Sequence, residues 1–125
     1  MVDERKAIRD HIGALVETVY PGRVFTTRDT DGRGLDEYVN IYFEEGEIIT
    51  EGLYRFTEAR LVVGYHRAGH PKDDQLDAGM EPIAALLDNE PDLGDVAQGL
   101  TPTGFQYSDT TAEFSSLLHN YVITY

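Results

Sequence analysis

The histidines and aspartates of residues 66–74 are the side chains with the clearest potential for metal binding. His66 and His70 supply imidazoles, and Asp73 and Asp74 supply carboxylates, which are common ligands of transition metals. A glycine and a proline between them interrupt any helix that would hold the four groups on one face. A polar loop that leads into a helix cap is therefore the simpler interpretation.

Two serines and a histidine near the carboxyl end have the side chains that nucleophilic catalysis uses. Ser115, Ser116 and His119 lack the Gly-x-Ser-x-Gly context of a nucleophile elbow. Alternation along a strand would also put Ser116 and His119 on opposite faces. We interpret them as polar strand residues.

The glycines of residues 29–40 are reminiscent of ligand-binding loops without completing one. Residues 29–32 resemble the start of a calcium loop, but Asn40 stands where a bidentate glutamate is required. Gly32 and Gly34 are not followed by the third glycine of a dinucleotide turn, because Glu37 occupies its place. We therefore predict an Asp-Gly turn and no catalytic, cofactor or specific metal site, so that the chain is not expected to be an enzyme.

The charges are divided unevenly along the 125 residues, whose formal net charge is -13. Residues 1–72 hold thirteen acids and all ten lysines and arginines, whereas residues 73–125 hold ten acids and no lysine or arginine. Attraction to nucleic acid or to an anionic membrane is disfavoured, because both depend on Lys and Arg. The acidic half is either a solvated surface or a face that awaits a basic protein partner.

The composition favours one compact domain over residues 1–125, with 41% hydrophobic residues and no repeat. Cysteine is absent, which excludes disulfides and thiolate metal sites. The amino terminus is charged, and the longest apolar run, residues 83–87, is too short to cross a bilayer. We expect a soluble protein that is not exported.

Two helices are predicted from apolar residues that recur at helical spacing. The first covers residues 3–20, with a cap at Asp3, and the second covers residues 73–87, where Pro82 should kink or break it. The apolar positions are Ile8, Ile12, Leu15, Val16 and Val19 in the first helix, and Leu76, Met80, Ile83, Ala84 and Leu87 in the second.

Alternating residues predict the strands. We place them at residues 24–27, 38–43, within 56–66, at 104–108 and at 117–125, with a turn at 44–47. Residues 88–103 should form an irregular crossover, with a short helical turn at 93–98. The predicted fold is α+β, a mixed and mostly antiparallel β-sheet with two helices packed on one face.

The carboxyl end carries a family resemblance. Its residues are Gly104-Phe105-Gln106-Tyr107, Ser115-Ser116 and Tyr121-Val122-Ile123-Thr124-Tyr125, and upstream pieces are Asp74-Gln75-Leu76-Asp77 and Leu93-Gly94-Asp95-Val96. With these segments the chain resembles the tail terminator proteins of lambda-like long-tailed phages, the minor tail protein U family. The resemblance is closest over residues 102–125 and loosest over the amino-terminal helix and the strands that follow it.

The resemblance implies a small structural subunit that forms a homo-hexameric ring on the finished tail tube, at the head-proximal end of the virion tail. Such a ring stops tube polymerisation and presents the surface for head attachment. Its partners would be the tail tube protein and head-tail connector proteins, and DNA would pass through without specific binding. Assembly would take place in the host cytoplasm without a cofactor, although Mg²⁺ could promote it non-specifically by screening the acids.

Exposed loops are the predicted contacts of a head-to-tail ring. They are residues 30–35, 44–51 and 66–72, and the candidate interface residues within them are Arg33, Glu44, Glu45, Glu47, Arg67, His70 and Lys72. Tyr38, Tyr42, Tyr121 and Tyr125 are either half-buried by neighbouring subunits or part of the chain's own core. The alternative function is an acidic protein-binding module, such as a DNA mimic or inhibitor, and a small ferredoxin-like enzyme would need a polar pocket that the sequence does not indicate.

Overall fold

A computed structural model describes residues 4–28, 32–90, 93–94, 96–109 and 113–125. The elements follow in the order α1 (Glu4–Glu17), β1 (Val24–Phe25), β2 (Glu37–Glu51), β3 (Tyr54–Ala68), α2 (Asp73–Asp88), β4 (Gly99–Ser108) and β5 (Phe114–Thr124). The strands form one sheet in the order β1-β2-β3-β5-β4. The pairing of β1 with β2 is parallel and the other pairings are antiparallel, which confirms the predicted mixed α+β fold.

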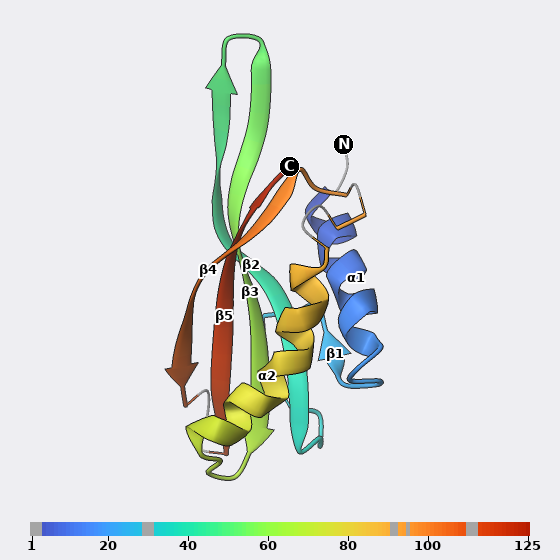
Figure 1. Cartoon of the computed structure of the whole chain (residues 1–125), viewed down its shortest axis with the longest axis vertical. Helices are drawn as coiled ribbons and strands as arrows, with labels where there is room; N and C mark the ends of the chain where they lie inside the picture. Colours follow the sequence, from blue (N-terminus) through green and yellow to red (C-terminus); the bar gives the residue numbers. More distant parts are fainter. Residues whose placement is uncertain (1–3, 29–31, 91–92, 95, 110–112) are drawn as a thin grey trace.

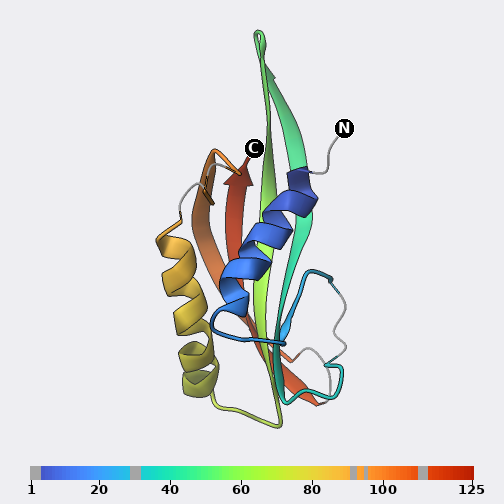
Figure 2. The same cartoon turned by 90° about the vertical axis from the view of Figure 1, so that its right-hand side faces the viewer.

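Both helices cover the same face of the sheet (Figures 1 and 2). α1 lies over β1 and β2, and α2 lies over β3 and β5. The predicted spacing in α1 is confirmed at Ile8, Ile12 and Val16, which are fully buried. Burial of these three side chains contributes about 6 kcal/mol of gross hydrophobic free energy. The predicted cap at Asp3 lies outside the described residues.

α2 continues through Pro82, so of the two predicted outcomes, a kink or a break, the break does not occur. Leu76, Met80, Ile83 and Leu87 keep one apolar stripe against the sheet, and this packing offsets the hydrogen bond that proline removes. The helix can also approach the sheet closely, because Gly79 lies over the ring of Tyr65. The hydroxyl of Tyr20 donates to the Gly79 carbonyl at 2.5 Å.

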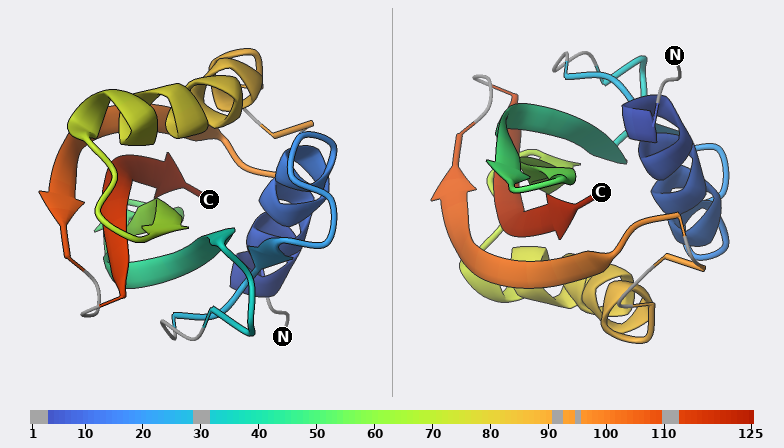
Figure 3. Two further views of the ribbon diagram at one scale, coloured as in Figure 1. Left: turned by 90° about the horizontal axis from the view of Figure 1, so that it is seen from below. Right: turned by 90° about the horizontal axis from the view of Figure 1, so that it is seen from above.

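The sheet is strongly curved, so that β4 and β5 bend round in the end-on views of Figure 3. Its helix-covered face holds the main core, with Ala59, Leu61, Val63 and Tyr65 of β3 buried there as predicted. On the other face Tyr38 is also fully buried, stacked on His66 and in contact with Phe114. The chain itself therefore buries Tyr38, as it does Tyr121 in the main core, whereas Tyr42 and Tyr125 are half-buried.

The closing strands are longer than predicted, since β4 begins at Gly99 and β5 at Phe114. No helix occurs among the described residues between α2 and β4, so the predicted helical turn there is not found. No helix in the described part of the chain is long and apolar enough to cross a membrane.

Candidate functional site

A long β-hairpin projects from the sheet at one end of the molecule (Figure 1). β2 and β3 pair over their full length, from Glu37↔Arg67 to Glu51↔Tyr54. β1 reaches only Val39 and Asn40 of β2. We define the projecting hairpin as residues 47–58, the part that begins at the Glu47↔Glu58 pair.

The base of the projecting hairpin lies where β5, the strand beside β3 in the sheet, ends. β5 follows β3 as far as Glu58↔Thr124. Two backbone hydrogen bonds between Thr57 and Tyr125, of 2.7 and 2.9 Å, complete this pairing. Beyond that point, within the described part of the chain, the strand pairings of β2 and β3 are with each other alone, so the outer edges of residues 48–56 are open. Open strand edges of this kind are templates for pairing with another chain.

The tip of the projecting hairpin is a two-residue turn, Gly52-Leu53, between Glu51 and Tyr54. Gly52 has a φ of 61°, and glycine at the first central position is the residue that a type II′ turn requires. The turn matches the twist of the flanking strands and therefore fixes their register.

Apolar side chains of the projecting hairpin face solvent. Ile48 is 64% exposed, Leu53 101% and Tyr54 77%. An isolated two-stranded hairpin is only marginally stable in water, and solvent-exposed apolar side chains at the end of such a hairpin add nothing to its own packing. These properties favour a surface that a protein partner covers.

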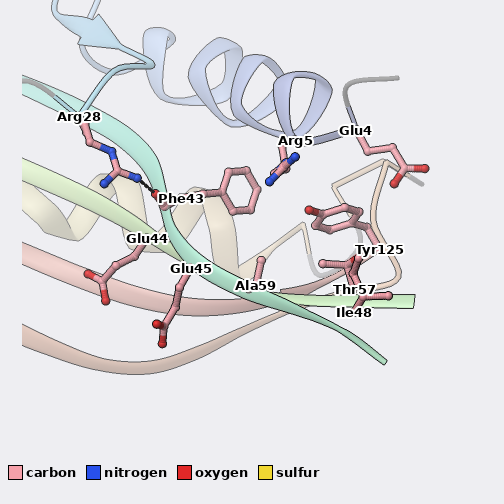
Figure 4. Close-up of a pocket in the computed structure, with 11 residues that line it drawn as sticks. Glu4, Arg5, Arg28, Phe43, Glu44, Glu45, Ile48, Thr57, Ala59 and Tyr125 are labelled. Carbon is pink, nitrogen blue, oxygen red and sulfur yellow. Dashed lines mark hydrogen bonds between the residues drawn. The ribbon is translucent and has the colours of Figure 1, made fainter. Parts of the chain in front are cut away.

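A hollow of about 420 Å³ lies at the base of the projecting hairpin (Figure 4). Phe43, Ala59 and Tyr125 form an apolar floor, and the rings of Phe43 and Tyr125 are 6.3 Å apart at 66°. Arg5 and Arg28 stand beside Phe43, whereas Glu44 and Glu45 extend from the opposite side of β2 in Figure 4. The hollow has no convergent set of acid, base and nucleophile and is suited to apolar and charged contacts.

The structure corrects the predicted turn at residues 44–47. Glu44, Glu45 and Glu47 lie within β2, which continues through them with a register shift between Phe43 and Glu45. Arg60 of β3 pairs with the carboxylates of Glu44 and Glu45 at 3.2 and 3.1 Å. A Glu-rich segment with a glycine looks like a turn in sequence, but here β3 supplies a continuous partner.

The other predicted interface residues lie at the opposite end of the molecule. Arg33 and His70 line one hollow of about 570 Å³, beside Phe114. Arg67 is the β3 partner of Glu37, at the far end of β2 from the projecting hairpin. Lys72 directly precedes α2, and its backbone N–H donates to the Gln75 side chain at 2.9 Å. The predicted set therefore splits into two groups, with Glu44, Glu45 and Glu47 in the middle of β2 and the others near or beyond its Glu37 end.

A buried polar network joins three strands. His66 lies 2.6 Å from Ser116 Oγ through Nδ1 and 2.8 Å from Asn40 Oδ1 through Nε2. Since the amide oxygen of Asn40 can only accept, Nε2 carries the proton and donates to it, and the Ser116 hydroxyl donates to Nδ1. Burial lowers the pKa of His66 to about 4. The imidazole is thus neutral near pH 7.

This network has the composition of a Ser-His-Asn triad, but all three residues are buried. A substrate has no access to Ser116, which is 0% exposed. Gly64 makes room for the network, since a Cβ there would come within 2.6 Å of Asn40 Oδ1. Sequence reasoning paired neither Ser116 nor Asn40 with His66; their positions on the second face of three strands were the available signal, but the strand register was unknown.

Two metal-ligand patterns, at residues 66–74 and 29–32, are not favoured as sites by the sequence. His66 is held in the buried network, away from the exposed His70 and the aspartates of α2. Among the residues that the structure describes, no three His, Asp or Glu side chains gather as a metal site. Residues 29–31, which resemble a calcium loop, lie outside the described ranges.

The sequence matches no protein-family model, and no curated protein matches it.

Proposed function

We propose that this protein is a structural tail terminator of a long-tailed phage or prophage, which forms a ring on the end of the tail tube. The resemblance to the minor tail protein U family supports the proposal, most closely over residues 102–125. The structural observation that carries it is the difference between the two ends of the molecule. One end is the projecting hairpin, and the other is the hollow beside Arg33 and His70.

Two unlike ends are what a terminator needs. If the long axis of each subunit follows the ring axis, six projecting hairpins extend from one face of the ring and none from the other. The hairpin face mates with the last ring of the tail tube through Ile48, Leu53 and Tyr54. Polymerisation stops because the opposite face does not reproduce the surface that the next tube ring would bind. That face is then available to head-tail connector proteins.

The proposed role is mechanical and needs no catalysis or cofactor. The net charge of -13 per chain disfavours adhesion of the DNA that would pass through the ring. Mg²⁺ would act only by screening acidic subunits from one another. The protein would assemble in the host cytoplasm and remain at the head-proximal end of the virion tail.

Capping of tail tubes tests the proposal. Purified tail tube protein would be polymerised with and without this protein, and the tube lengths measured by electron microscopy. The wild type should stop elongation, and Leu53→Ser with Tyr54→Ser should lose this effect, since both side chains are exposed and the fold does not depend on them. Val19→Ser is the matched control, because Val19 is an exposed apolar residue far from the projecting hairpin in sequence. Tubes that elongate equally with and without the wild type would refute the proposal.

The acidic second half supports one other candidate, a DNA mimic or inhibitor that occupies a basic cleft of its target. Such a protein would compete with DNA for a basic partner and would leave tube length unchanged. Competition of this kind, without capping, would favour this second candidate.

A further inference from the structure

A groove lined by basic side chains lies between α1 and the strands β1 and β2. It measures about 410 Å³, and the described residues that line it include Arg5, Lys6, Arg9 and Arg28 and no acid. We call these four residues the basic groove. Their gathering is unexpected in a chain whose net charge is -13.

Aromatic rings hold two of the arginines in the basic groove. The guanidinium of Arg9 lies over the ring of Phe43 at 5.9 Å, and that of Arg28 lies over Tyr42 at 5.5 Å. Arg28 also donates to the Phe43 carbonyl. Lys6 pairs with Asp10 of its own helix at 2.6 Å, on the exposed surface. The stacked arginines are therefore arranged in advance, which reduces the entropy that binding costs.

An acidic surface with matching charge follows α2. Asp74, Asp77, Glu81 and Asp88 are exposed and occupy one side of the helix, at spacings of three, four and seven residues. We call these four residues the acidic stripe. Ala78 and Ala85 are exposed beside it and would let another backbone approach closely. No lysine or arginine follows Lys72 in the sequence, so no base of residues 73–125 neutralises this surface.

The basic groove and the acidic stripe lie on different sides of one molecule. In both end-on views α1 stands between α2 and the strands β1 and β2 (Figure 3). The contacts of the two helices agree, since α1 packs on β1 and β2, and α2 packs on β3 and β5. One molecule cannot bring its own two surfaces together. Two copies can, in a head-to-tail contact that leaves one groove and one stripe unoccupied for the next copies.

We infer that the basic groove of one subunit binds the acidic stripe of a second copy of this chain. The arginines of the basic groove face the carboxylates of the acidic stripe in this contact, although Lys6 already pairs with Asp10 and Asp77 already accepts a hydrogen bond from Tyr107. The head-to-tail symmetry of the contact is the one that closes rings. The inference deepens the proposed function, since it rests on the ring and assigns its subunit interface to these two surfaces. It leaves the projecting hairpin to the tail tube.

A second copy is a better occupant of the basic groove than a nucleic acid. The rest of the chain is strongly acidic and repels a polyanion as a whole, whereas the acidic stripe is a local patch with its own exposed alanines. The acidic stripe is also present in every copy, at the same concentration as the groove.

Charge reversal on each surface, with native mass measured by analytical ultracentrifugation at low salt, tests the inference. The groove variant is Arg5→Glu with Arg28→Glu, and the stripe variant is Asp77→Lys with Glu81→Lys. Each variant alone should associate at least about tenfold more weakly than the wild type, because it presents like charges to itself. An equimolar mixture of the two variants should regain association, since both mixed contacts are again complementary. A control, Arg55→Glu with Arg60→Glu, alters net charge as the groove variant does, replaces exposed arginines of β3 outside both surfaces, and should associate like the wild type.

The outcomes separate this inference from the proposed function. Wild-type association that neither reversal weakens, or a mixture that stays dissociated, would overturn the assigned interface while tube capping could still occur. A wild type that is monomeric at every salt and protein concentration would overturn it as well. A duplex DNA probe bound by the wild type and released by the groove variant would assign the groove to nucleic acid instead. Association that falls in both variants and returns in the mixture would establish the contact whether or not the ring caps a tube.

Discussion

The imidazole of His66 lies flat on the phenol ring of Tyr38, with the ring centroids 4.4 Å apart and the planes 12° from parallel. Both residues are on the sheet face opposite the helices, and both are buried. Phe114 of β5 meets Tyr38 edge-on, with the ring centroids 5.4 Å apart. This aromatic group and the hydrogen bonds of His66 join β2, β3 and β5, so the second face of the sheet has a core of its own.

The buried His66 should make the protein less stable in mild acid. The pKa of His66 is about 4 in the folded chain, against 6.5 for an ordinary histidine, because burial disfavours the charged form. The unfolded chain therefore takes up the proton first, and stability that is present above pH 6.5 is lost as the pH falls towards 4. The shift corresponds to about 3 kcal/mol of unfolding free energy across this range. Urea unfolding at a series of pH values measures it.

His66→Gln separates this effect from the titration of carboxylates. The variant should be less stable than the wild type at pH 7, but its unfolding free energy should fall less between pH 6.5 and 4. His70→Gln replaces an exposed histidine and should keep the wild-type slope. Equal slopes in the wild type and His66→Gln would show that His66 does not cause the loss.

Gly79→Ala should destabilise the fold by about 2 kcal/mol, the cost of overpacking. A Cβ at this position would lie 2.2 Å from ring atoms of Tyr65, so the helix or the ring must move. Gly13→Ala is the matched control in the other helix, where the nearest atom is the Thr26 side-chain methyl at 3.3 Å. It should change stability by no more than about 1 kcal/mol, the gain in helix propensity. Thermal unfolding compares the two, and a Gly79→Ala protein as stable as Gly13→Ala would contradict the packing.

Backbone amides of the projecting hairpin should exchange hydrogen at least about tenfold faster than those near Leu61 of the same strand, which has neighbours on both sides. Hydrogen exchange read by mass spectrometry resolves the two regions. Addition of preformed tail tubes should slow exchange in residues 48–56 and leave residues 60–66 unchanged. Full protection of the projecting hairpin in the isolated protein would argue against a partner-binding role.

Asp77→Asn should lower the pKa of Tyr107. The phenol donates to the Asp77 carboxylate at 2.5 Å, and this hydrogen bond is the main reason that the pKa of Tyr107 is raised to about 12. Without the carboxylate, Tyr107 should titrate nearer 10, its ordinary value. Ultraviolet difference titration of tyrosinate measures the change, and Tyr107→Phe identifies the signal. Glu81→Gln, on the same helix, should leave the curve unchanged; a similar shift in that variant would point to a general field effect.

Periodicity predicted the apolar stripes of both helices and the main-core positions of β3. α1 and α2 show their stripes directly, and the alternate residues from Ala59 to Tyr65 lie in the main core, although residues 61–66 are buried on both faces of the sheet. The length of β2 could not be read in this way, because the exposed stretch that begins at Glu44 has no buried face. Its strand structure comes from pairing with β3, which is a tertiary property.

The candidate site was harder to predict for the same reason. Glu44, Glu45 and Glu47 were recognised as exposed, but as a turn and not as the strand that leads into the projecting hairpin. Leu53 and Tyr54 gave no signal, because one apolar pair in a polar segment does not reveal whether it is buried. The basic groove combines α1 with residues after β1, and only the packing of α1 on the sheet brings these charges together.

The two-residue turn at Gly52-Leu53 also has a kinetic consequence. A turn this short closes in microseconds and can zip β2 onto β3 before distant parts of the chain meet. The pairing of β3 with β5, from Ala68↔Phe114 to Glu58↔Thr124, must instead wait for the whole intervening chain, including α2, to be placed. The segment that can form earliest is thus the one that the finished monomer supports least. The local turn sets its register, and under the proposed function its final stabilisation would come from contact with the tail tube.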